Sequence, residues 1–509
     1  MTNSPPRSPL SNVTLALQRG RLGMWPVVAI VMAAAAPLTV VAGGATTGWA
    51  VTGVVGIPVA YLAVAAILGV FSVGYVAMSR KIVNAGAFYS YIARGLGRVP
   101  GVAASFVALL AYNAMQVGLY GGFGAVLAGF LADRAGVDVA WWMCAFAAWA
   151  VIAVMGVLRV DLNGSVLAVL LVTEIGIAAV FAVVELAHPA NNEVTFTTLA
   201  PSHLFAAGIG AALVTAITGF VGFEATAVYS EETKDPQRTV PRATYTALII
   251  IGLLYALCSW AMSVAAGPDN VVEAARTNGT ELMFTLVQPH LGQTWVDAGH
   301  LLFVTSLFAA LLAFHNTAAR YAFALGRERV LPQWLGITSR RNRSPKWGSL
   351  TQTLLAAVVI AGYAIAGLDP IVYLFFWITV LGGLGVLILM AATSLAVVAF
   401  FVHDAANRAG VSVWRRAVAP TLAALGLLAI LAATLNQFAT LLGVDATSPW
   451  RWVLPSSFAV AAVLGAGWAL ILKVSNPEVY DRIGRGANSV TPDVPQAAPQ
   501  AAGAGGGVR

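Results

Sequence analysis

Charged residues are scarce in this chain of 509 residues, of which Asp, Glu, Lys and Arg make up only 10%. Soluble domains carry about 25% charged residues, so the composition excludes an ordinary soluble domain. Cysteine is scarcer still, and both cysteines, Cys144 and Cys258, fall in apolar stretches. We therefore expect no disulfide framework. No nucleotide-binding loop, metal-ligand spacing or His-Glu-x-x-His motif occurs, so we expect neither an enzyme nor a bound metal or cofactor.

Apolar residues are abundant, at 59% of the chain, with a mean hydropathy of +0.82. Runs of about 20 apolar residues recur, which is the length that crosses a hydrocarbon core of about 30 Å. The pattern predicts an all-α polytopic membrane protein with about twelve transmembrane helices. We place the spans at about residues 24–46, 54–79, 100–132, 139–158, 163–186, 206–230, 243–266, 294–322, 350–367, 370–401, 418–442 and 449–472.

The basic residues are distributed unevenly between the segments that connect the spans. If the N-terminus starts in the cytoplasm, 25 of the 28 Lys and Arg residues fall in cytoplasmic segments. Such an asymmetry sets the orientation of a membrane protein. It predicts a multi-pass plasma-membrane protein with both termini in the cytoplasm. The net charge of +7 is thereby explained without a nucleic-acid partner.

Two of the spans are interrupted by small residues. Residues 36–48 contain Pro37 and a glycine pair, and residues 219–224 contain two glycines before Glu224. Proline removes a backbone donor, glycine permits unwinding, and exposed backbone at membrane depth needs protein or a polar ligand to satisfy it. Breaks at matching places in two halves indicate a midplane substrate site in a secondary transporter. For the first span alone, a kinked and closely packed helix explains the pattern equally well.

The breaks divide the chain into repeats. We expect a cytoplasmic segment over residues 1–23, which is too polar for a signal peptide, followed by a transporter domain over residues 24–473. A tail at residues 474–509 is rich in Pro, Ala and Gly and is expected to be cytoplasmic and largely disordered. Within the domain we expect a first repeat at about 24–186, an inverted second repeat at about 206–401 and two further helices at about 418–472.

Acidic residues inside the spans are the candidates for ion coupling. Only Glu224 and Glu174 of the 21 acids lie well inside predicted spans. Burying an acid costs about 2.5–3.5 kcal/mol on insertion scales, so each needs a cavity or a partner. Because burial disfavours the charged form of a carboxyl group, both are candidates for proton exchange. A hydrogen-bonded brace that never titrates is the alternative for each.

Polar side chains also follow one face of the third span. Tyr112, Gln116 and Tyr120 are four residues apart and so share a helix face, with Asn113 beside them. We take Tyr112, Asn113 and Gln116 as candidates for lining a cavity, with interhelical hydrogen bonding as the alternative. His315 lies deep in the eighth span, where a packed hydrogen-bonding role is favoured over a relay.

Several stretches together resemble the amino acid–polyamine–organocation (APC) superfamily of permeases. The similarity covers about residues 20–475. Its motifs occur in the expected order: NAGAFYSYIARGLG at 84–97, GFVGFE at 219–224, EETKDPQRTVP at 231–241 and HNTAARYAFALG at 315–326.

The resemblance implies the leucine-transporter-like fold of five plus five inverted helices and two more. It also implies transport of an amino acid or amine by alternating access. Backbone amides of the first helix would take the substrate carboxylate and carbonyls of the sixth its ammonium group, as helix-end dipoles favour. Carried onto this chain, the implied substrate residues are Pro37, Leu38, Thr39, Val40, Thr218, Gly219, Phe220 and Val221.

The sequence departs from the family in two places. Where relatives carry a gating aromatic, six residues before the acid of the sixth helix, this chain has Thr218, so Phe220 or Trp377 is expected to substitute. Where some relatives carry a lysine that replaces a sodium ion, this chain has Glu174. We expect proton coupling through Glu224 and Glu174. Sodium coupling through Thr305 and Ser306, exchange of two substrates, and a passive channel are the alternatives.

Overall fold

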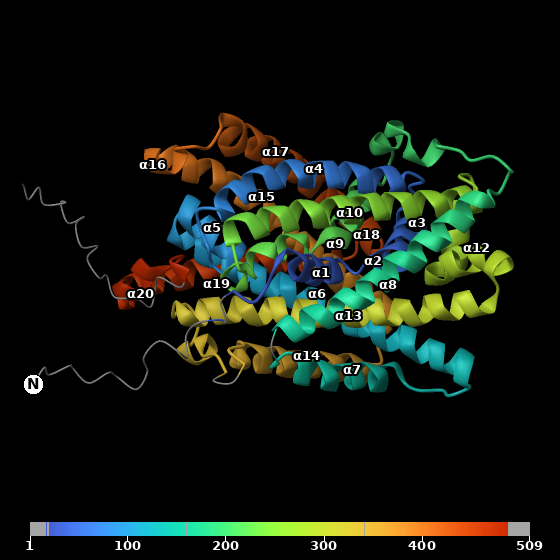
Figure 1. The fold of residues 1–509 in the computed structure, drawn as a ribbon, viewed down its shortest axis with the longest axis horizontal. Helices are drawn as coiled ribbons and strands as arrows, with labels where there is room; N and C mark the ends of the chain where they lie inside the picture. Colours follow the sequence, from blue (N-terminus) through green and yellow to red (C-terminus); the bar gives the residue numbers. More distant parts are fainter. Residues whose placement is uncertain (1–16, 18–19, 159, 340–341, 487–509) are drawn as a thin grey trace, which may run out of the picture.

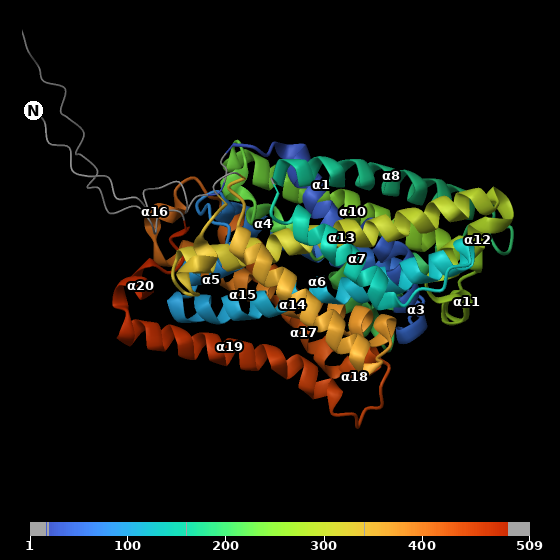
Figure 2. The same cartoon turned by 90° about the horizontal axis from the view of Figure 1, so that it is seen from below.

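The computed structural model describes residues 17, 20–158, 160–339 and 342–486. Within these ranges the regular structure is helical, apart from one isolated bridge between Leu22 and Thr233. Long helices run side by side along the long axis of the molecule, and both ends of the described chain lie at the same end of this bundle (Figures 1 and 2). We call this the termini end.

Among the described residues, eleven segments are long and apolar enough to cross a membrane, and the shorter apolar helix α7 makes a twelfth. The prediction of an all-α polytopic membrane protein is confirmed. In chain order the segments are α1–α3 (Met24–Thr52), α4 (Ile57–Ser79), α6 (Arg98–Ala135), α7 (Trp141–Met155), α8 (Val160–Ala187), α9–η4 (Ile209–Ala227), α10 (Pro236–Ala266), α13 (Gln293–Arg327), α14 (Lys346–Ala366), η8–α15 (Pro370–His403), η9–α17 (Trp414–Asn436) and α19 (Trp450–Ser475).

Shorter helices lie in the connections and in the chain beyond α19. They are α5 (Ala87–Gly95), η2 (Thr197–Leu199), η3 (Pro201–Phe205), η5 (Ser230–Glu232), α11 (Val271–Asn278), η6 (Gly279–Glu281), α12 (Leu282–Leu291), η7 (Gln333–Gly336), α16 (Ala405–Arg408), α18 (Phe438–Leu442) and α20 (Pro477–Arg482).

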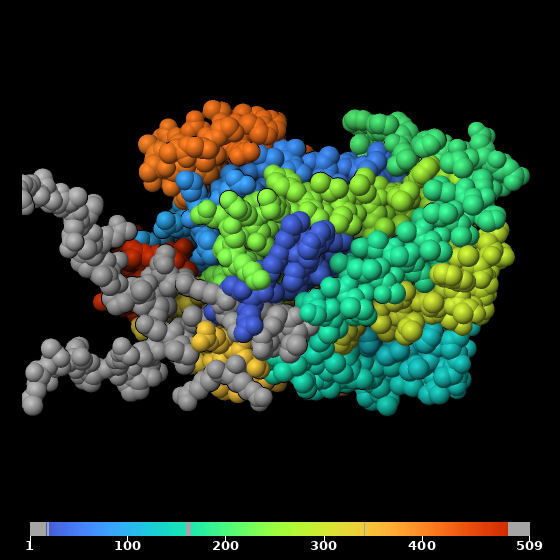
Figure 3. Space-filling model, in the orientation of Figure 1, coloured from blue at the N-terminus to red at the C-terminus, as the bar shows by residue number. Residues whose placement is uncertain are grey.

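Helices α1 and α6 occupy the interior of the bundle. α6 packs against α13, α15 and α19, and α1 packs against α8, α10 and α13. Only a narrow strip of α1 is visible at the surface between α8 and α10 (Figure 3). Peripheral helices instead expose large apolar side chains, among them Leu354 of α14 and Val463 of α19. A helix that is apolar on all sides suits a lipid environment, so these faces are the ones suited to lipid.

The first membrane segment breaks at Ala36. Helix α1 ends at Ala35, and Ala36 takes the left-handed conformation with φ of 44°. A short helix, α2 (Pro37–Thr39), then begins with proline, and the π-helical turn η1 (Val40–Ala45) contains Gly43 and Gly44. The left-handed conformation is unfavourable for a residue with a Cβ atom, so the surrounding structure must stabilise it.

The sixth membrane segment breaks directly before its acid. Helix α9 ends at Phe220, and Gly222 has φ of 120°, which a residue with a side chain rarely adopts. The segment continues as the 3₁₀ turn η4 (Phe223–Ala227), which contains Glu224. A Cβ atom on Gly222 would lie 2.5 Å from the Cβ atom of Ala34. The two breaks are therefore in direct contact.

The predicted terminal segments are described only in part. Residue 17 and residues 20–23 belong to the predicted N-terminal segment, and residues 477–486 of the predicted tail form α20 and a short extension. The remainder of both, residues 1–16, 18–19 and 487–509, lies outside the described residues.

Candidate functional site

A single tyrosine joins the two helix breaks. The hydroxyl of Tyr255, on α10, donates to the carbonyl of Ala35 at 2.6 Å and lies 3.0 Å from the carbonyl of Gly219. Its side chain is fully buried. These two carbonyls stand at the broken ends of α1 and α9, where backbone groups lose their partners within the helix. Tyr255 was not among the residues predicted from the sequence, because its position in an apolar span carries no signal.

A cavity lies between the two breaks. Among the described residues that line it, none carries a charge, and the polar side chains are threonines. The lining consists of Ala34, Ala35, Ala36, Thr39, Val40, Gly43, Gly44, Thr47, Met115, Leu119, Thr215, Thr218, Gly219, Phe314, Phe375, Phe376, Thr379 and Val380.

The backbone supplies the polarity that the side chains lack. Helices α1 and α9 both end at the cavity, so their C-terminal carbonyls carry partial negative charge there. An ammonium group in the cavity would therefore find partial negative charge at these two helix ends. In the segment that begins at Pro37, which has no amide hydrogen itself, the Leu38 amide interacts with Glu174 behind the break. The Thr39 amide donates to Ser306, also behind the break.

The residues implied by resemblance divide between the cavity wall and the layer behind it. Thr39 and Val40 line the cavity on the first break, and Thr218 and Gly219 line it on the second. The other four are buried but do not line it; they are Pro37, Leu38, Phe220 and Val221. The wall also includes residues 34–36, where the chain breaks, and the glycine pair, Gly43 and Gly44.

Glu224 is held between two helices by both of its carboxylate oxygens. One oxygen accepts a hydrogen bond from the Tyr112 hydroxyl at 2.7 Å, and the other accepts from the backbone amide of Gly222 at 2.9 Å. Its own carbonyl accepts from the Tyr75 hydroxyl at 2.7 Å. Glu224 thus joins the broken sixth segment to α6 and α4, on the side of the cavity that faces the termini end.

Glu174, on α8, lies behind the first break. Its side chain is 1% exposed and interacts with the Ser306 hydroxyl and the backbone amide of Leu38. The amide of Thr39 donates to the same Ser306 hydroxyl at 3.3 Å. One carboxylate oxygen of Glu174 and the Thr39 hydroxyl have no hydrogen-bond partner. The Glu174 carboxylate and the hydroxyls of Thr39 and Ser306 thus lie together at the break, and two of these oxygen atoms have no hydrogen-bond partner.

The remaining polar residues of α6 serve different surroundings. Gln116 contacts His315 Nδ1 at 3.1 Å and accepts from Gln352, and His315 Nε2 contacts the Ser349 hydroxyl at 2.7 Å. This network joins α6, α13 and α14 away from the cavity lining. Asn113 donates to the Leu109 carbonyl one turn earlier in its own helix. Of the stripe, Tyr112 alone contacts Glu224.

Aromatic side chains of η8 cover the cavity on the side away from the termini end. Phe375 and Phe376 line the cavity, and Phe375 lies close enough to Gly122 of α6 that a Cβ atom there would be 2.7 Å away. Trp377, named as a candidate gate from the sequence, turns away and donates to the Leu442 carbonyl at 3.1 Å. The neighbouring residues were missed because the π-helical turn shifts which side chains face inward.

A third acid is buried within the spans. Glu185, near the end of α8, is 2% exposed, and its Oε1 atom has no hydrogen-bond partner. From the sequence it falls at the end of a span, so its burial was not predicted.

Comparison with known proteins identifies the family. A family model described as amino acid permease matches residues 22–467, nearly the whole chain. The chain belongs to the amino acid permease family. The resemblance seen in its motifs is thereby confirmed, and the apolar segments are those of a multi-pass membrane protein.

Relatives of the permease match with modest identity. The branched-chain amino acid permease BcaP of Lactococcus lactis is 25% identical over 62% of this chain and 70% of its own length. The low-affinity putrescine importer PlaP of Escherichia coli is 26% identical over 29% of this chain and 30% of its own. An uncharacterized transporter of Mycobacterium tuberculosis is 31% identical over 29% of this chain, and the match spans about a third of that relative, 32%.

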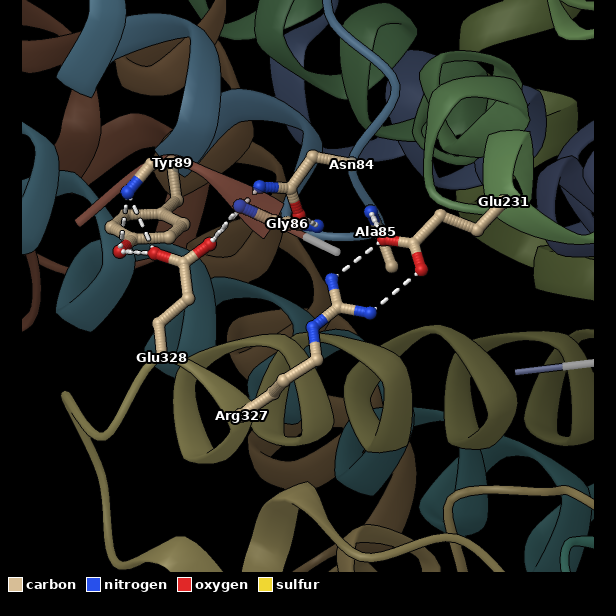
Figure 4. Close-up of polar contacts among 9 residues, drawn as sticks. Asn84, Ala85, Gly86, Tyr89, Glu231, Arg327 and Glu328 are labelled. Carbon is tan, nitrogen blue, oxygen red and sulfur yellow. Dashed lines mark hydrogen bonds and ion pairs between the residues drawn. The ribbon is translucent and has the colours of Figure 1, made fainter. Parts of the chain in front are cut away.

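Buried ion pairs close the permease at its termini end. Arg320 of α13 binds Glu232 with N–O distances of 2.6 and 3.1 Å. Arg327, two turns along, binds Glu231 with two N–O distances of 2.7 Å (Figure 4). All four side chains are at most 8% exposed. The carbonyl of Glu232 also accepts from the backbone amide of Leu22 at 3.0 Å. These pairs hold the segment after the sixth helix and the start of the chain against α13.

Proposed function

We propose that this permease carries a neutral amino acid with an apolar side chain across the plasma membrane, coupled to protons, by alternating access. The observation that carries the proposal is the cavity. Its described lining holds no charged side chain, so only backbone groups can match the charge of a substrate there. The ammonium group of an amino acid would lie at the carbonyl ends of α1 and α9, and its side chain would lie against Met115, Leu119 and Val380.

Amines without a carboxylate fit the same cavity less well. A diamine carries two positive charges, and burying each requires an acidic or carbonyl partner. The described lining holds no acid, and Glu224 lies behind the wall with both oxygens already bonded. The name of the Lactococcus lactis relative, a branched-chain amino acid permease, supports the choice of an apolar amino acid.

Glu224 is our candidate for the proton site. Protonating the carboxylate would remove its ability to accept two charge-assisted hydrogen bonds, from Tyr112 and Gly222. Since Gly222 belongs to the break and Tyr112 to α6, the change would loosen the broken segment from its neighbour. Substrate and proton would then act on the same structural element, which is what coupling requires.

Sodium is the second candidate ion, and Glu174 supports it. The carboxylate of Glu174, the Thr39 hydroxyl and the Ser306 hydroxyl are oxygen groups of the type that hard cations prefer. In the proton-coupled scheme, Glu174 exchanges a proton instead of binding sodium. The two schemes differ in what drives accumulation.

The five-plus-five inverted repeat and the orientation with the termini end in the cytoplasm are part of the same proposal. The charge distribution along the sequence supports that orientation. Contact of the first and sixth segments at their breaks supports the repeat.

The test is uptake of labelled leucine by purified permease in proteoliposomes. We expect saturable uptake that unlabelled valine and isoleucine inhibit and putrescine does not. An inside-alkaline pH gradient should drive accumulation without sodium. Accumulation that needs sodium would replace the proton by the second ion, and inhibition by putrescine alone would overturn the assignment of the substrate. Uptake that never saturates would favour a channel.

A further inference from the structure

At the termini end, a buried carboxylate outside the membrane segments accepts several hydrogen bonds. Glu328 directly follows α13 and is 1% exposed. It accepts hydrogen bonds from the Asn84 side chain at 3.1 Å and the Tyr89 hydroxyl at 2.5 Å (Figure 4). Two backbone amides also donate to it, from Gly484 at 2.6 Å and Gly486 at 2.7 Å. Four donors therefore surround one buried carboxylate.

The last two donors belong to the end of the described chain. We call residues 477–486, which are α20 and its extension, the C-terminal strap. Gly484 and Gly486 both have positive φ, of 79° and 61°, and this backbone conformation directs their two amides towards one anion. A Cβ atom on Gly486 would lie 2.8 Å from the Asn84 side chain. Ile483, 3% exposed, packs into the core, so the strap is seated in the protein.

The strap joins parts of the chain that are distant in sequence. Asn84 and Tyr89 belong to the connection between α4 and α6, Glu328 ends α13, and the strap follows α19. Directly beside them, Glu231 accepts from the backbone amide of Ala85 at 3.0 Å while it binds Arg327. The strap thus covers the layer of ion pairs that closes the termini end.

The contact between the strap and Glu328 compensates for the burial of a carboxylate. Burial raises the pKa of Glu328, while the hydrogen bonds from Tyr89 and the Gly484 amide oppose that rise. If the strap leaves, Glu328 loses two of its donors and must gain water in their place, because a buried and unpaired carboxylate is unfavourable. Departure of the strap and access of water to this end are therefore linked.

We propose that the C-terminal strap is a latch that stabilises the conformation closed at the termini end, and that it leaves Glu328 whenever the cavity opens there. The proposal rests on the proposed alternating access, since a latch has meaning only if this end opens. It assigns to the end of the chain control over how often the cavity faces the cytoplasm.

The test measures access to the cavity and needs no transport. Cys144 and Cys258 are replaced by alanine, and Thr218→Cys places a thiol in the cavity wall. A membrane-impermeant maleimide is then applied to inside-out and to right-side-out vesicles. We expect Gly486→Ala and Glu328→Gln to raise the labelling rate in inside-out vesicles at least tenfold. Gly467→Ala, on α19, is the matched control, because nothing lies within 4 Å of its added Cβ atom.

Unchanged labelling in both strap variants would overturn the latch, provided that their melting temperatures in detergent match that of the control. A variant that melts early is set aside in favour of the other, since Glu328→Gln keeps the shape of the side chain and Gly486→Ala keeps the charge. A permease that transports none of the panel yet shows the labelling change would overturn the proposed substrate and leave the latch standing.

Discussion

At the scale of single residues, Glu224 has the contacts expected of a coupling group. Its two oxygens link Tyr112 of α6 to the amide of Gly222 in the break. A purely structural brace has the same hydrogen bonds, so the two roles differ only in what happens when the charge is removed. Tyr112 also stacks on Tyr321 of α13, with ring centroids 5.0 Å apart.

We expect Glu224→Gln to abolish accumulation driven by a pH gradient, because the amide cannot exchange a proton. Exchange of leucine for leucine should survive at a measurable rate, since the cavity wall is untouched. Tyr112→Phe, which keeps the ring and removes one hydrogen bond, is the milder comparison. Normal accumulation with Glu224→Gln would show that this acid is a brace.

The cavity wall predicts a change in selectivity. Val380 is 2% exposed and lines the cavity. Val380→Phe would fill part of the space assigned to the substrate side chain. A mismatch of one or a few methylene groups changes recognition by about 1–3 kcal/mol, or 10- to 200-fold. We therefore expect leucine uptake to fall at least tenfold while alanine uptake falls less. Equal losses for the two substrates would place the side-chain site elsewhere.

At the scale of elements, the break in the sixth segment depends on one glycine. Gly222 combines a φ of 120° with a contact to Ala34 that leaves no room for a Cβ atom. Such strained backbone costs on the order of 1–3 kcal/mol for a residue with a side chain. Gly222→Ala should lower the melting temperature of the purified permease and its leucine uptake. Gly69→Ala, where nothing lies within 4 Å, should change neither; a silent Gly222→Ala would mean that the breaks are not in close contact.

The elements also show how far the sequence could be read. The apolar runs predicted the membrane segments because only helix length and hydropathy decide them. The breaks were predicted from glycine and proline, and the first one begins at Ala36, the first residue of the predicted interruption, where an alanine takes a left-handed conformation. Tertiary contacts impose that conformation, and no local sequence signal marks it. The sequence therefore did not mark residues 34–36 as part of the cavity wall, whereas Thr39 and Val40, which were named from the sequence, do line it.

Partners from distant segments were beyond reach for the same reason. Tyr255 and Glu185 lie in spans whose sequence is otherwise apolar, so nothing local distinguishes a tyrosine that joins two breaks from one that packs in a core. Glu231 and Glu232 fell in a recognised motif, but only the fold pairs them with Arg327 and Arg320. Trp377 was named from the sequence as a candidate gate, but Phe375 lines the cavity, because a π-helical turn changes which side chains face inward.

At the scale of the whole molecule, the closures at the two ends differ. Towards the termini end lie the Glu224 contacts, the Arg320 and Arg327 ion pairs and the strap on Glu328. On the other side the cavity is covered by Phe375 and Phe376, which are only half-buried. A transporter that works by alternating access must be closed on one side while it opens on the other. The structure is closed at the termini end.

The measurement that tests the central claim most directly is proton movement caused by substrate. Proteoliposomes that hold the permease and a pH-sensitive dye are diluted into sodium-free buffer, and leucine is added outside. The account predicts acidification of the lumen that saturates with leucine and is absent with Glu224→Gln. Leucine that accumulates while the lumen keeps its pH would contradict it.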